Sequence, residues 1–230
     1  MAGWGEFAAA LAAFLLSHAL PSLPGARGWL VARMGKRGYG AAFGLLSTLL
    51  LVWLVAAAGR APLLLLWDQA PWMRWVPNLG MPLVCVLAAL AIAAPNPFSF
   101  EGRARGFDPA RPGIAGLTRH PLLWALLLWS LAHLLVNGDL AHGVLFGGFA
   151  AMALAGMSMQ DSRHRRVWGA AEWARLSSRT SVLPLAAWLT GRWRPAPPGR
   201  GTLLRAVLGL LVWAVLWHLH LPVIGVSPAP

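Results

Sequence analysis

Long apolar stretches alternate along the chain with shorter segments rich in arginine, proline and glycine. A helix that crosses the hydrocarbon core of a bilayer needs about 20 mostly apolar residues. Six stretches approach that length, and four of them contain no Asp, Glu, Lys or Arg. They are residues 4–20, 39–58, 79–95, 121–137, 140–159 and 203–222. The pattern predicts an all-α polytopic integral membrane protein with about six transmembrane helices.

The segments between these spans suggest how the chain is organised. Residues 1–192 form the predicted membrane domain, residues 193–202 a proline-rich linker, and residues 203–222 an additional C-terminal transmembrane helix. Residues 164–180 combine tryptophans with arginines, which predicts an amphipathic helix on the anionic inner leaflet. Residues 61–78 are too interrupted by proline to span, and their tryptophans favour the outer membrane interface.

Composition supports the membrane interpretation and excludes other classes. Apolar residues make up 58% of the 230 residues and charged residues 11%, whereas soluble domains carry roughly 45–50% and about 25%. Disordered chains, fibrous repeats and most water-soluble folds are therefore excluded. Cys85 is the single cysteine, so an intramolecular disulfide and a four-thiolate zinc site are excluded as well.

The net charge of +12 raises the alternative of nucleic-acid binding, but its distribution favours a membrane orientation. Almost all basic residues lie in the first, third and fifth connections between the predicted spans. Because cytoplasmic loops carry the excess of Lys and Arg, we expect these connections in the cytoplasm and both termini in the periplasm of a bacterial inner membrane. The charge is then explained without any nucleic-acid partner.

Three of the seven histidines stand out because ionisable groups in spans usually face a bundle or a cavity. His18 ends the first span, and a bond to a backbone carbonyl is its simplest interpretation. His133 shares a helix face with Trp129 and Asn137, spaced four residues apart. It too can bond a carbonyl, but a neutral imidazole in an apolar pocket is also the usual heme ligand.

Arg119 and His120 directly precede Pro121. Proline favours the first turn of a helix, which places His120 near the N-cap of the fourth span. The helix dipole and the Arg119 guanidinium would attract an anion such as a heme propionate, a phosphate or a cofactor carboxylate. The alternative is a plain helix cap beside a cytoplasmic arginine. Hydrolytic acid–base chemistry has little support, because no paired carboxylates lie within the spans.

Several short motifs together resemble the NnrU membrane protein family over roughly residues 5–190. They are Ser17-His18-Ala19-Leu20-Pro21-Ser22, Gly35-Lys36-Arg37-Gly38-Tyr39, Pro95-Asn96-Pro97, Thr118-Arg119-His120-Pro121, the stretch from Trp129 to Asp139, and Phe146-Gly147. The resemblance implies an inner-membrane protein linked to nitrogen-oxide metabolism in denitrifying bacteria.

That family is in turn similar to 15-cis-zeta-carotene isomerase, a heme b protein with histidine ligands. By this resemblance His133 is the first candidate heme ligand and His18 the second, with redox, nitric-oxide or polyene-isomerising activity. The predicted topology puts His18 near the inner face and His133 near the outer face. Either the spans are tilted or broken, or His18 pairs with His120 instead.

A more distant likeness supports an alternative. Arg119-His120-Pro121, Asp161, Gly169, Glu172-Trp173 and Pro184 resemble the isoprenylcysteine carboxyl methyltransferase pattern. That resemblance implies S-adenosylmethionine near Arg119 and His120, although Asp161 stands where consecutive glutamates are usual and Trp173 replaces a tyrosine. A third hypothesis is a non-catalytic partner of a respiratory complex. The expected ligands are thus a hydrophobic polyene or a nitrogen oxide in the first case and a methyl donor in the second.

Overall fold

The computed structural model describes residues 2–23, 25–99 and 103–230. Within these ranges every regular element is a helix, and the backbone forms two isolated β-bridges but no strand. The α-helices are α1 (Ala2–Ala19), α2 (Ala26–Arg60), α3 (Trp75–Ala91), α4 (Ile114–Leu117), α5 (Pro121–Val136), α6 (Leu140–Ser177), α7 (Ala186–Leu189) and α8 (Arg200–Ile224). Short 3-10 helices occupy Leu20–Ser22 and Pro71–Arg74.

Four of the described helical segments are long and apolar enough to cross a membrane: Ala26–Arg60, Pro71–Ala91, Leu140–Ser177 and Arg200–Ile224. Helix α5 is apolar but shorter, at 16 residues. The predicted all-α polytopic membrane fold is confirmed.

The chain forms two compact units. Unit 1 comprises residues 1–68 and 137–145, and unit 2 comprises residues 69–136 and 146–230. Helix α6 therefore starts in unit 1 and continues in unit 2.

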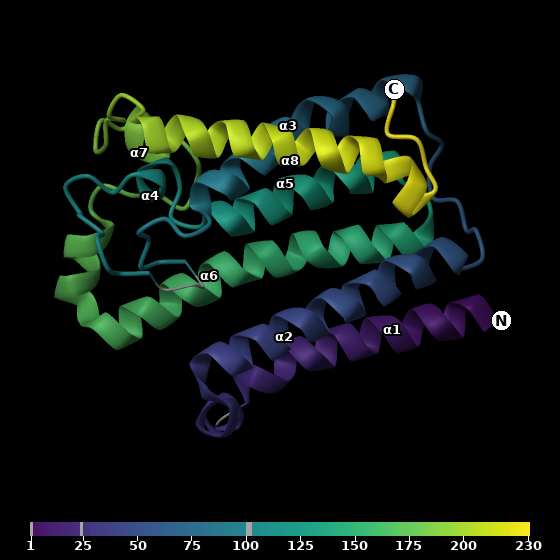
Figure 1. Cartoon of the computed structure of the whole chain (residues 1–230), viewed down its shortest axis with the longest axis horizontal. Coiled ribbons are helices and arrows are strands. Elements are labelled where there is room, and N and C mark those ends of the chain that lie inside the picture. The colour runs from purple at the N-terminus through teal and green to yellow at the C-terminus, as the bar shows by residue number, and fades with distance from the viewer. Residues whose placement is uncertain (1, 24, 100–102) are drawn as a thin grey trace. The chain divides into compact units, whose positions relative to one another are not determined.

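Unit 1 is built on the packing of α1 against α2 (Figure 1). On α1 the buried residues Phe7, Ala10 and Phe14 recur every three or four positions, as expected for one buried helix face. Near the start of α1 the two helices approach closely, because a Cβ on Gly3 would lie 2.6 Å from the Arg60 carbonyl oxygen. The Arg60 guanidinium also forms an ion pair with Glu6 across this contact, at 2.5 Å.

A second contact in unit 1 joins residues 64–67 to the turn before α6. The amide of Leu66 donates to the carbonyl of Gly138 at 2.7 Å, and the amide of Leu140 donates to Leu64 at 2.9 Å. Position 138 requires glycine, since a Cβ there would collide with the Trp67 carbonyl oxygen. The apolar residues 63–66 are thus fixed as an extended segment rather than a helix.

Unit 2 is a bundle in which α3 packs against both α5 and α8 (Figure 1). Gly209 allows α8 to approach α3, because a Cβ at that position would lie 2.7 Å from the Cα of Val86. Between α5 and α6 the buried core consists of Leu127, Ala150, Ala153 and Met157. Trp124 and Val182 pack against this core, which ties the segment after α6 to the bundle.

The helix boundaries differ from the predicted spans in two places that matter for the site. Helix α3 begins at Trp75 instead of residue 79 and ends at Ala91, so residues 92–95 leave the helix earlier than predicted. The predicted span 140–159 continues as a helix through the polar run after residue 159 as far as Gly169, where the backbone is not helical. The predicted amphipathic helix 164–180 is therefore divided at Gly169, and its second part forms the last turns of α6, which ends at Ser177.

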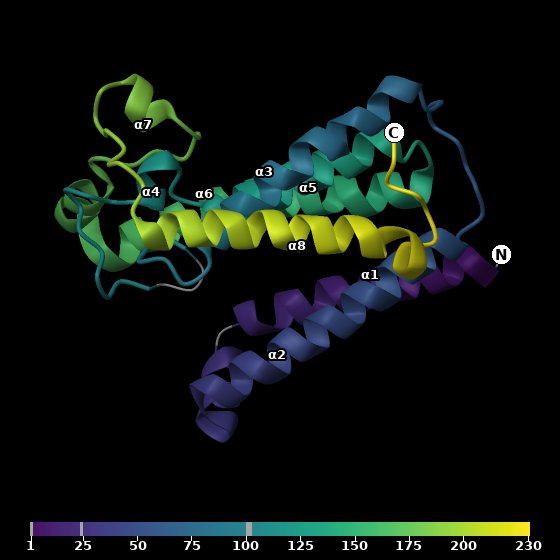
Figure 2. The same cartoon turned by 45° about the horizontal axis from the view of Figure 1, so that its top comes forward.

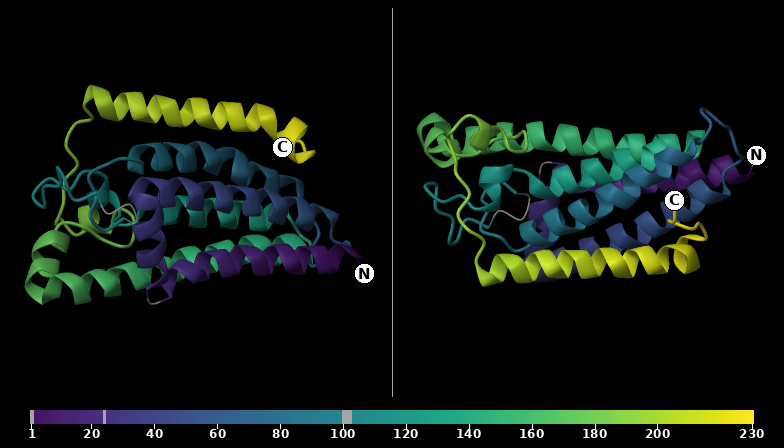
Figure 3. Two further views of the ribbon diagram at one scale, coloured as in Figure 1. Left: turned by 60° about the horizontal axis from the view of Figure 1, so that its bottom comes forward. Right: turned by 90° about the horizontal axis from the view of Figure 1, so that it is seen from above.

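Both long helices bend at a glycine. In α6 the bend is at Gly169 (φ 75°, ψ 167°), and in α2 it is at Gly35 (φ 69°, ψ 163°). This backbone region is essentially restricted to glycine. After Gly169 the last turns of α6 change direction, as the left view of Figure 3 shows.

The loops of unit 2 gather at one end of its helices, together with α4 and α7, which contact each other (Figure 2). We call this region, residues 92–99, 103–120 and 160–205, the arginine-rich end. It contains every arginine of unit 2 except Arg74.

Candidate functional site

The segment that leads into α5 lies at the arginine-rich end and is held by the segment that follows α6. The amide of Arg119 donates to the Ser181 carbonyl at 2.7 Å, and the Thr118 hydroxyl donates to the Val182 carbonyl at 2.7 Å. Further along, the amide of Leu185 donates to Leu117 at 2.9 Å. Residues 117–120 therefore have a fixed backbone before the helix begins.

His120 occupies the position expected from Pro121. Its carbonyl accepts the first bond of α5, from the amide of Trp124 at 2.9 Å. Its own amide lies 3.4 Å from the Thr118 hydroxyl, and its side chain is completely buried.

Asn96 connects a third segment to this backbone. Its side-chain amide donates to the Arg119 carbonyl at 2.9 Å, and its side-chain oxygen accepts the amide of Phe98 at 3.0 Å. Asn96 is only 1% exposed. Asn96 belongs to the Pro95-Asn96-Pro97 motif, from which no role for it could be predicted, and it joins the loop after α3 to the start of α5.

A buried ionic cluster forms where these segments meet α6. Asp161 contacts the Arg119 guanidinium at 3.0 Å with one carboxylate oxygen and the His120 Nε2 at 2.8 Å with the other. The side chains of Arg119 and Asp161 are 11% and 9% exposed. We call Arg119, His120 and Asp161 the Arg–His–Asp cluster.

Electrostatics favour the charged form of Arg119 despite its burial. Burial lowers the pKa of the Arg119 guanidinium, and the Asp161 carboxylate opposes this by stabilising the cation. An arginine side chain stays protonated in proteins. The cluster thus pairs a buried cation with a buried anion, and the imidazole Nε2–H of His120 supplies a second donor to Asp161.

Aromatic rings enclose the guanidinium. The Arg119 guanidinium carbon lies 5.1 Å from the centre of the Trp173 ring and 5.9 Å from that of Phe98. Phe98 is fully buried and also contacts the rings of His164 and Trp168. Trp173 reaches this cluster because α6 bends at Gly169. Such cation–π contacts contribute more when the cation is desolvated.

Three buried nitrogens at this end have no hydrogen-bond partner among the described residues: Arg119 Nε, His120 Nδ1 and His164 Nδ1. Buried polar atoms are usually satisfied by protein or by ordered water. The cluster therefore has unused hydrogen-bonding capacity for a water molecule or a polar ligand.

The structure groups only part of the predicted site. Arg119 and His120 lie together, and Asp161 joins them from α6. His133 is thirteen residues further along α5, about 20 Å away along a regular helix. His18 belongs to unit 1 and His133 to unit 2. Each of these two histidines is considered by itself.

His133 and His18 share one local arrangement. The Nδ1 of His133 lies 2.9 Å from the Trp129 carbonyl, and the Nδ1 of His18 lies 2.8 Å from the Phe14 carbonyl. A carbonyl only accepts hydrogen bonds, so Nδ1 is the donor in both contacts, and in a neutral imidazole of this tautomer Nε2 carries the lone pair. This is the tautomer of a histidine that ligates a metal through Nε2. The described residues contain no group of three or more His, Cys, Asp or Glu suited to a metal ion.

Comparison with known proteins decides the family. The family model of the NnrU protein matches residues 6–228. The chain belongs to the NnrU family. The NnrU match includes α8, which the resemblance over residues 5–190 had left outside. Neither the curated proteins nor the solved structures contain a match to this chain. The likenesses to zeta-carotene isomerase and to the methyltransferases therefore stay predictions.

Proposed function

We propose that this NnrU-family protein resides in the bacterial inner membrane, binds heme b through His133 and serves nitrogen-oxide metabolism. The observation that supports it is the contact of the His133 Nδ1 with the Trp129 carbonyl. This contact holds the ring through Nδ1, so the proposal assigns the heme iron to Nε2. A carbonyl partner of this kind also raises the basicity of a histidine ligand.

The surroundings of His133 suit a heme protein as well. The rings of Trp129 and Phe146 each lie 5.2 Å from the imidazole, and Phe149 contacts Trp129. Apolar rings exclude water and lower the local dielectric constant, which are the means by which a protein adjusts a heme. The bound heme would supply one-electron chemistry and a site for a small ligand such as a nitrogen oxide.

His18 is the second candidate ligand and is judged independently. Its ring stacks on Phe14 with the ring centres 4.2 Å apart, and it contacts the edge of Phe43. The aromatic contacts and the carbonyl-bound Nδ1 repeat, within unit 1, the arrangement around His133.

The absorption spectrum of the detergent-purified chain, expressed with ample heme, tests this proposal. We expect a Soret band that changes on reduction, is lost or shifted in His133→Ala, and is shifted in His18→Ala if His18 is also a ligand. His220→Ala is the matched control, because its Nδ1 also contacts a carbonyl, that of Val226 at 2.7 Å, at an exposed position. Absence of a Soret band, or an unchanged spectrum in His133→Ala, would contradict the proposal.

The kind of activity can be separated on the same preparation. Nitric oxide added to the reduced protein should shift the Soret band if the heme handles nitrogen oxides. Conversion of a cis polyene to its trans isomer, followed by chromatography, would instead indicate an isomerase. Heme binding without either response would favour a non-catalytic partner of a respiratory complex.

The orientation is part of the proposal. All arginines of unit 2 except Arg74 lie at its arginine-rich end, and the positive-inside rule places that end in the cytoplasm. The C-terminus is then periplasmic, and the basic first connection, by the same rule, places the N-terminus in the periplasm as well. Alkaline phosphatase fused after Pro230 should be active and a fluorescent protein fused there should be dark; the opposite result would reverse the orientation.

A membrane methyltransferase is the second candidate, favoured by the unpartnered Arg119 Nε and His120 Nδ1. It would bind S-adenosylmethionine at the arginine-rich end. Calorimetric titration should then show tight binding of S-adenosylmethionine that Arg119→Ala abolishes and the exposed variant Arg166→Ala preserves. No binding would remove this candidate.

A further inference from the structure

The segment between α6 and α8 projects apolar side chains outward at the arginine-rich end. Four of them are exposed: Leu183 (62%), Leu185 (42%), Trp188 (48%) and Leu189 (76%). Leu185 and Leu189 are one helical turn apart, because the Leu189 amide donates to the Leu185 carbonyl at 2.9 Å. We call these four side chains the α7 apolar patch. Large apolar side chains that gather on one short exposed turn mark an interaction surface.

The backbone that carries the α7 apolar patch is fixed by contacts on its inner side. Ala187, in the middle of α7, is fully buried, and its carbonyl accepts the Trp193 amide at 2.9 Å. The Trp193 ring lies against Gly116 of α4, where an added Cβ would collide with it. The four side chains therefore cannot fold inward unless these contacts break.

Leu185 has an unusual backbone conformation. Its φ is +65°, a left-handed value that few residues other than glycine adopt. Such a conformation persists only where the surrounding structure imposes it, and it is frequent at functional sites. Because the Leu185 side chain is exposed, this conformation presents an apolar group to the outside of the protein.

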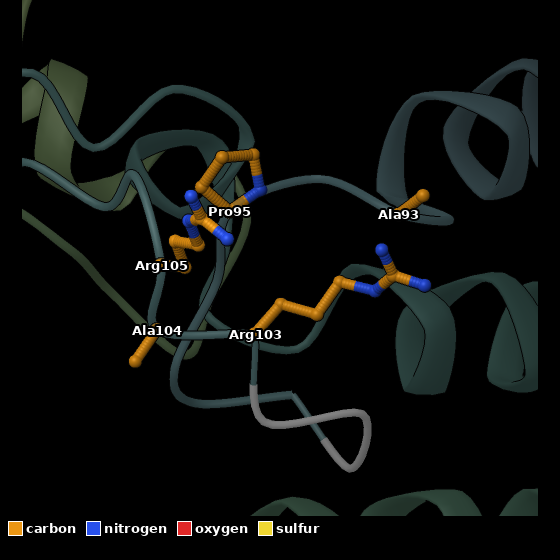
Figure 4. A pocket seen from close by; sticks show the side chains of 5 residues that line it. All are labelled: Ala93, Pro95, Arg103, Ala104 and Arg105. Carbon is orange, nitrogen blue, oxygen red and sulfur yellow. The ribbon is translucent and has the colours of Figure 1, made fainter. Parts of the chain in front are cut away.

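The charge around the α7 apolar patch favours an anionic partner. Three exposed arginines flank it in the sequence: Arg179, Arg192 and Arg194. None of the three forms an ion pair with the residues that the structure describes, and residues 173–230 contain no Asp or Glu. The loop after α3 adds Arg103 and Arg105 to the same end (Figure 4). Guanidinium groups match the oxygens of phosphate groups.

The α7 apolar patch starts level with the first turn of α5. The indole of Trp124, in that first turn, donates to the carbonyl of Val182 at 2.8 Å, and Leu183 follows directly. Helix α5 has 16 residues, so it is roughly 24 Å long, less than the hydrocarbon core of about 30 Å. Its first turn therefore lies near the border between hydrocarbon and head groups. At that depth, apolar side chains can enter the hydrocarbon while arginines reach the phosphates.

We propose that the α7 apolar patch is an interfacial membrane anchor, which inserts among the acyl chains of a phospholipid surface while the flanking arginines bind the lipid phosphates. Through the bonds from Arg119 to Ser181 and from Thr118 to Val182, the anchor also holds the backbone before α5 at a fixed depth. The assignment to the cytoplasmic leaflet rests on the proposed orientation, whereas the insertion itself does not.

Nitroxide spin labels on the full chain test this inference. Cys85, the single cysteine, is replaced by alanine, and Leu189→Cys then carries the label in vesicles of phosphatidylglycerol and phosphatidylethanolamine. Oxygen concentrates in hydrocarbon, whereas a water-soluble nickel chelate, supplied on both sides of the vesicles, is excluded from it. We expect the label at Leu189→Cys to collide mainly with oxygen, and a label at Leu183→Cys to do the same.

The matched control is Ala110→Cys. Ala110 is exposed in the polar loop 103–112, and its carbonyl accepts a bond from Arg179 at 3.1 Å, so it lies close to one of the flanking arginines. The ratio of oxygen to nickel collisions should be several-fold lower at Ala110→Cys than at Leu189→Cys, with an intermediate ratio at Arg194→Cys. Thermal unfolding like that of the parent chain confirms that each labelled variant is folded.

The other outcomes overturn the inference. If the label at Leu189→Cys is as accessible to nickel as the label at Ala110→Cys, the α7 apolar patch faces water. If both oxygen and nickel are excluded from it, protein covers the patch, as a second copy of the chain would. A ratio at Arg194→Cys as high as that at Leu189→Cys would contradict the assignment of the arginines to the phosphates.

The outcome is distinguishable from that of the proposed function. His133→Ala should remove the heme spectrum without changing the collision ratio at Leu189→Cys. A reporter that reversed the orientation would refute the cytoplasmic leaflet while leaving the collision ratios as they are.

Discussion

Among the residues that the structure describes, each unit has an arginine–carboxylate pair that joins separate helices or segments, and these two pairs differ in their surroundings. In unit 1, Arg60 and Glu6 are 2.5 Å apart, with side chains 55% and 35% exposed. In unit 2, Arg119 and Asp161 are 3.0 Å apart but only 11% and 9% exposed. The shorter contact is the more exposed one, so the N···O distance alone does not indicate how much a pair contributes to stability.

The pairs also differ in what their carboxylates hold. Glu6 accepts a further bond from the Trp53 indole at 3.3 Å, at an exposed position. Asp161 uses its second oxygen for the buried His120 ring. Exposed pairs are screened by solvent and contribute little to stability, whereas removing one partner of a buried pair leaves an uncompensated charge. We therefore expect substitutions in the Arg–His–Asp cluster to have the larger effects.

Asp161→Asn should be the most damaging change. It keeps the shape of the side chain but leaves the Arg119 cation buried without a counter-charge, which costs about 3–5 kcal/mol of unfolding free energy. Thermal unfolding of the detergent-purified chain measures the loss. Glu172→Gln is the control within unit 2, since Glu172 pairs with Arg175 at an exposed site. Equal losses of unfolding free energy in Asp161→Asn and Glu172→Gln would show that the buried and the exposed pair contribute alike.

Asn96→Ala should come next. It leaves the Phe98 amide without its side-chain acceptor and the Arg119 carbonyl without its side-chain donor. Because an unsatisfied buried group costs about 1–3 kcal/mol, we expect a loss of roughly 2–4 kcal/mol. Ser99→Ala, which removes one hydroxyl bond to the Asn96 carbonyl in the same loop, should cost less. A smaller effect for Asn96→Ala than for Ser99→Ala would show that Asn96 does not hold the segments together.

A matched pair of threonines extends the comparison to both units. Thr118 in unit 2 is fully buried and donates to Val182, whereas Thr48 on α2 is exposed and donates to Gly44 within its own helix. Thr118→Val should lower the unfolding free energy by about 1–3 kcal/mol, because the Val182 carbonyl loses a buried donor. Thr48→Val should change it by about 0.5 kcal/mol or less. Chemical denaturation measures both losses. Similar losses of unfolding free energy in the two variants would show that burial does not determine the contribution of these hydroxyl groups.

Glu6→Gln should have the smallest effect of the series. Its partner Arg60 is an exposed side chain, so removing the Glu6 charge leaves no buried cation without a counter-charge. The melting temperature should stay close to that of the parent chain at low and high salt. A drop comparable to that of Asp161→Asn would mean that the two pairs are equivalent.

The fold class followed from the sequence because apolar length alone identifies membrane helices. The helix start at Pro121 was also predictable, since proline and the preceding histidine provide a local signal. The continuation of α6 past residue 159 was not predicted, because a helix can carry polar residues beyond the apolar stretch without a break. The bend lies instead at Gly169, where backbone geometry, rather than hydropathy, interrupts the helix.

The candidate site was predicted only in part. Arg119 and His120 were identified from their place before Pro121, whereas Asp161 was named only within the methyltransferase pattern and was not predicted to contact them. Its pairing depends on a contact over 41 residues of sequence separation, which no local pattern reveals. One signal was present: Asp161 is the acidic residue that precedes a run of arginines directly after an apolar stretch. The roles of Asn96 and Trp173 required the tertiary structure.

The bend at Gly169 gives one residue without a side chain control over the surroundings of Arg119. Alanine at this position would force a choice between backbone strain of about 1–3 kcal/mol and a straight helix that points Trp173 away from the guanidinium. The added methyl group would thus move the Trp173 ring, four residues further along the chain, away from the Arg119 guanidinium. The bend of α2 at Gly35 has the same steric cause. The direction of both long helices therefore depends on a residue that has no Cβ atom.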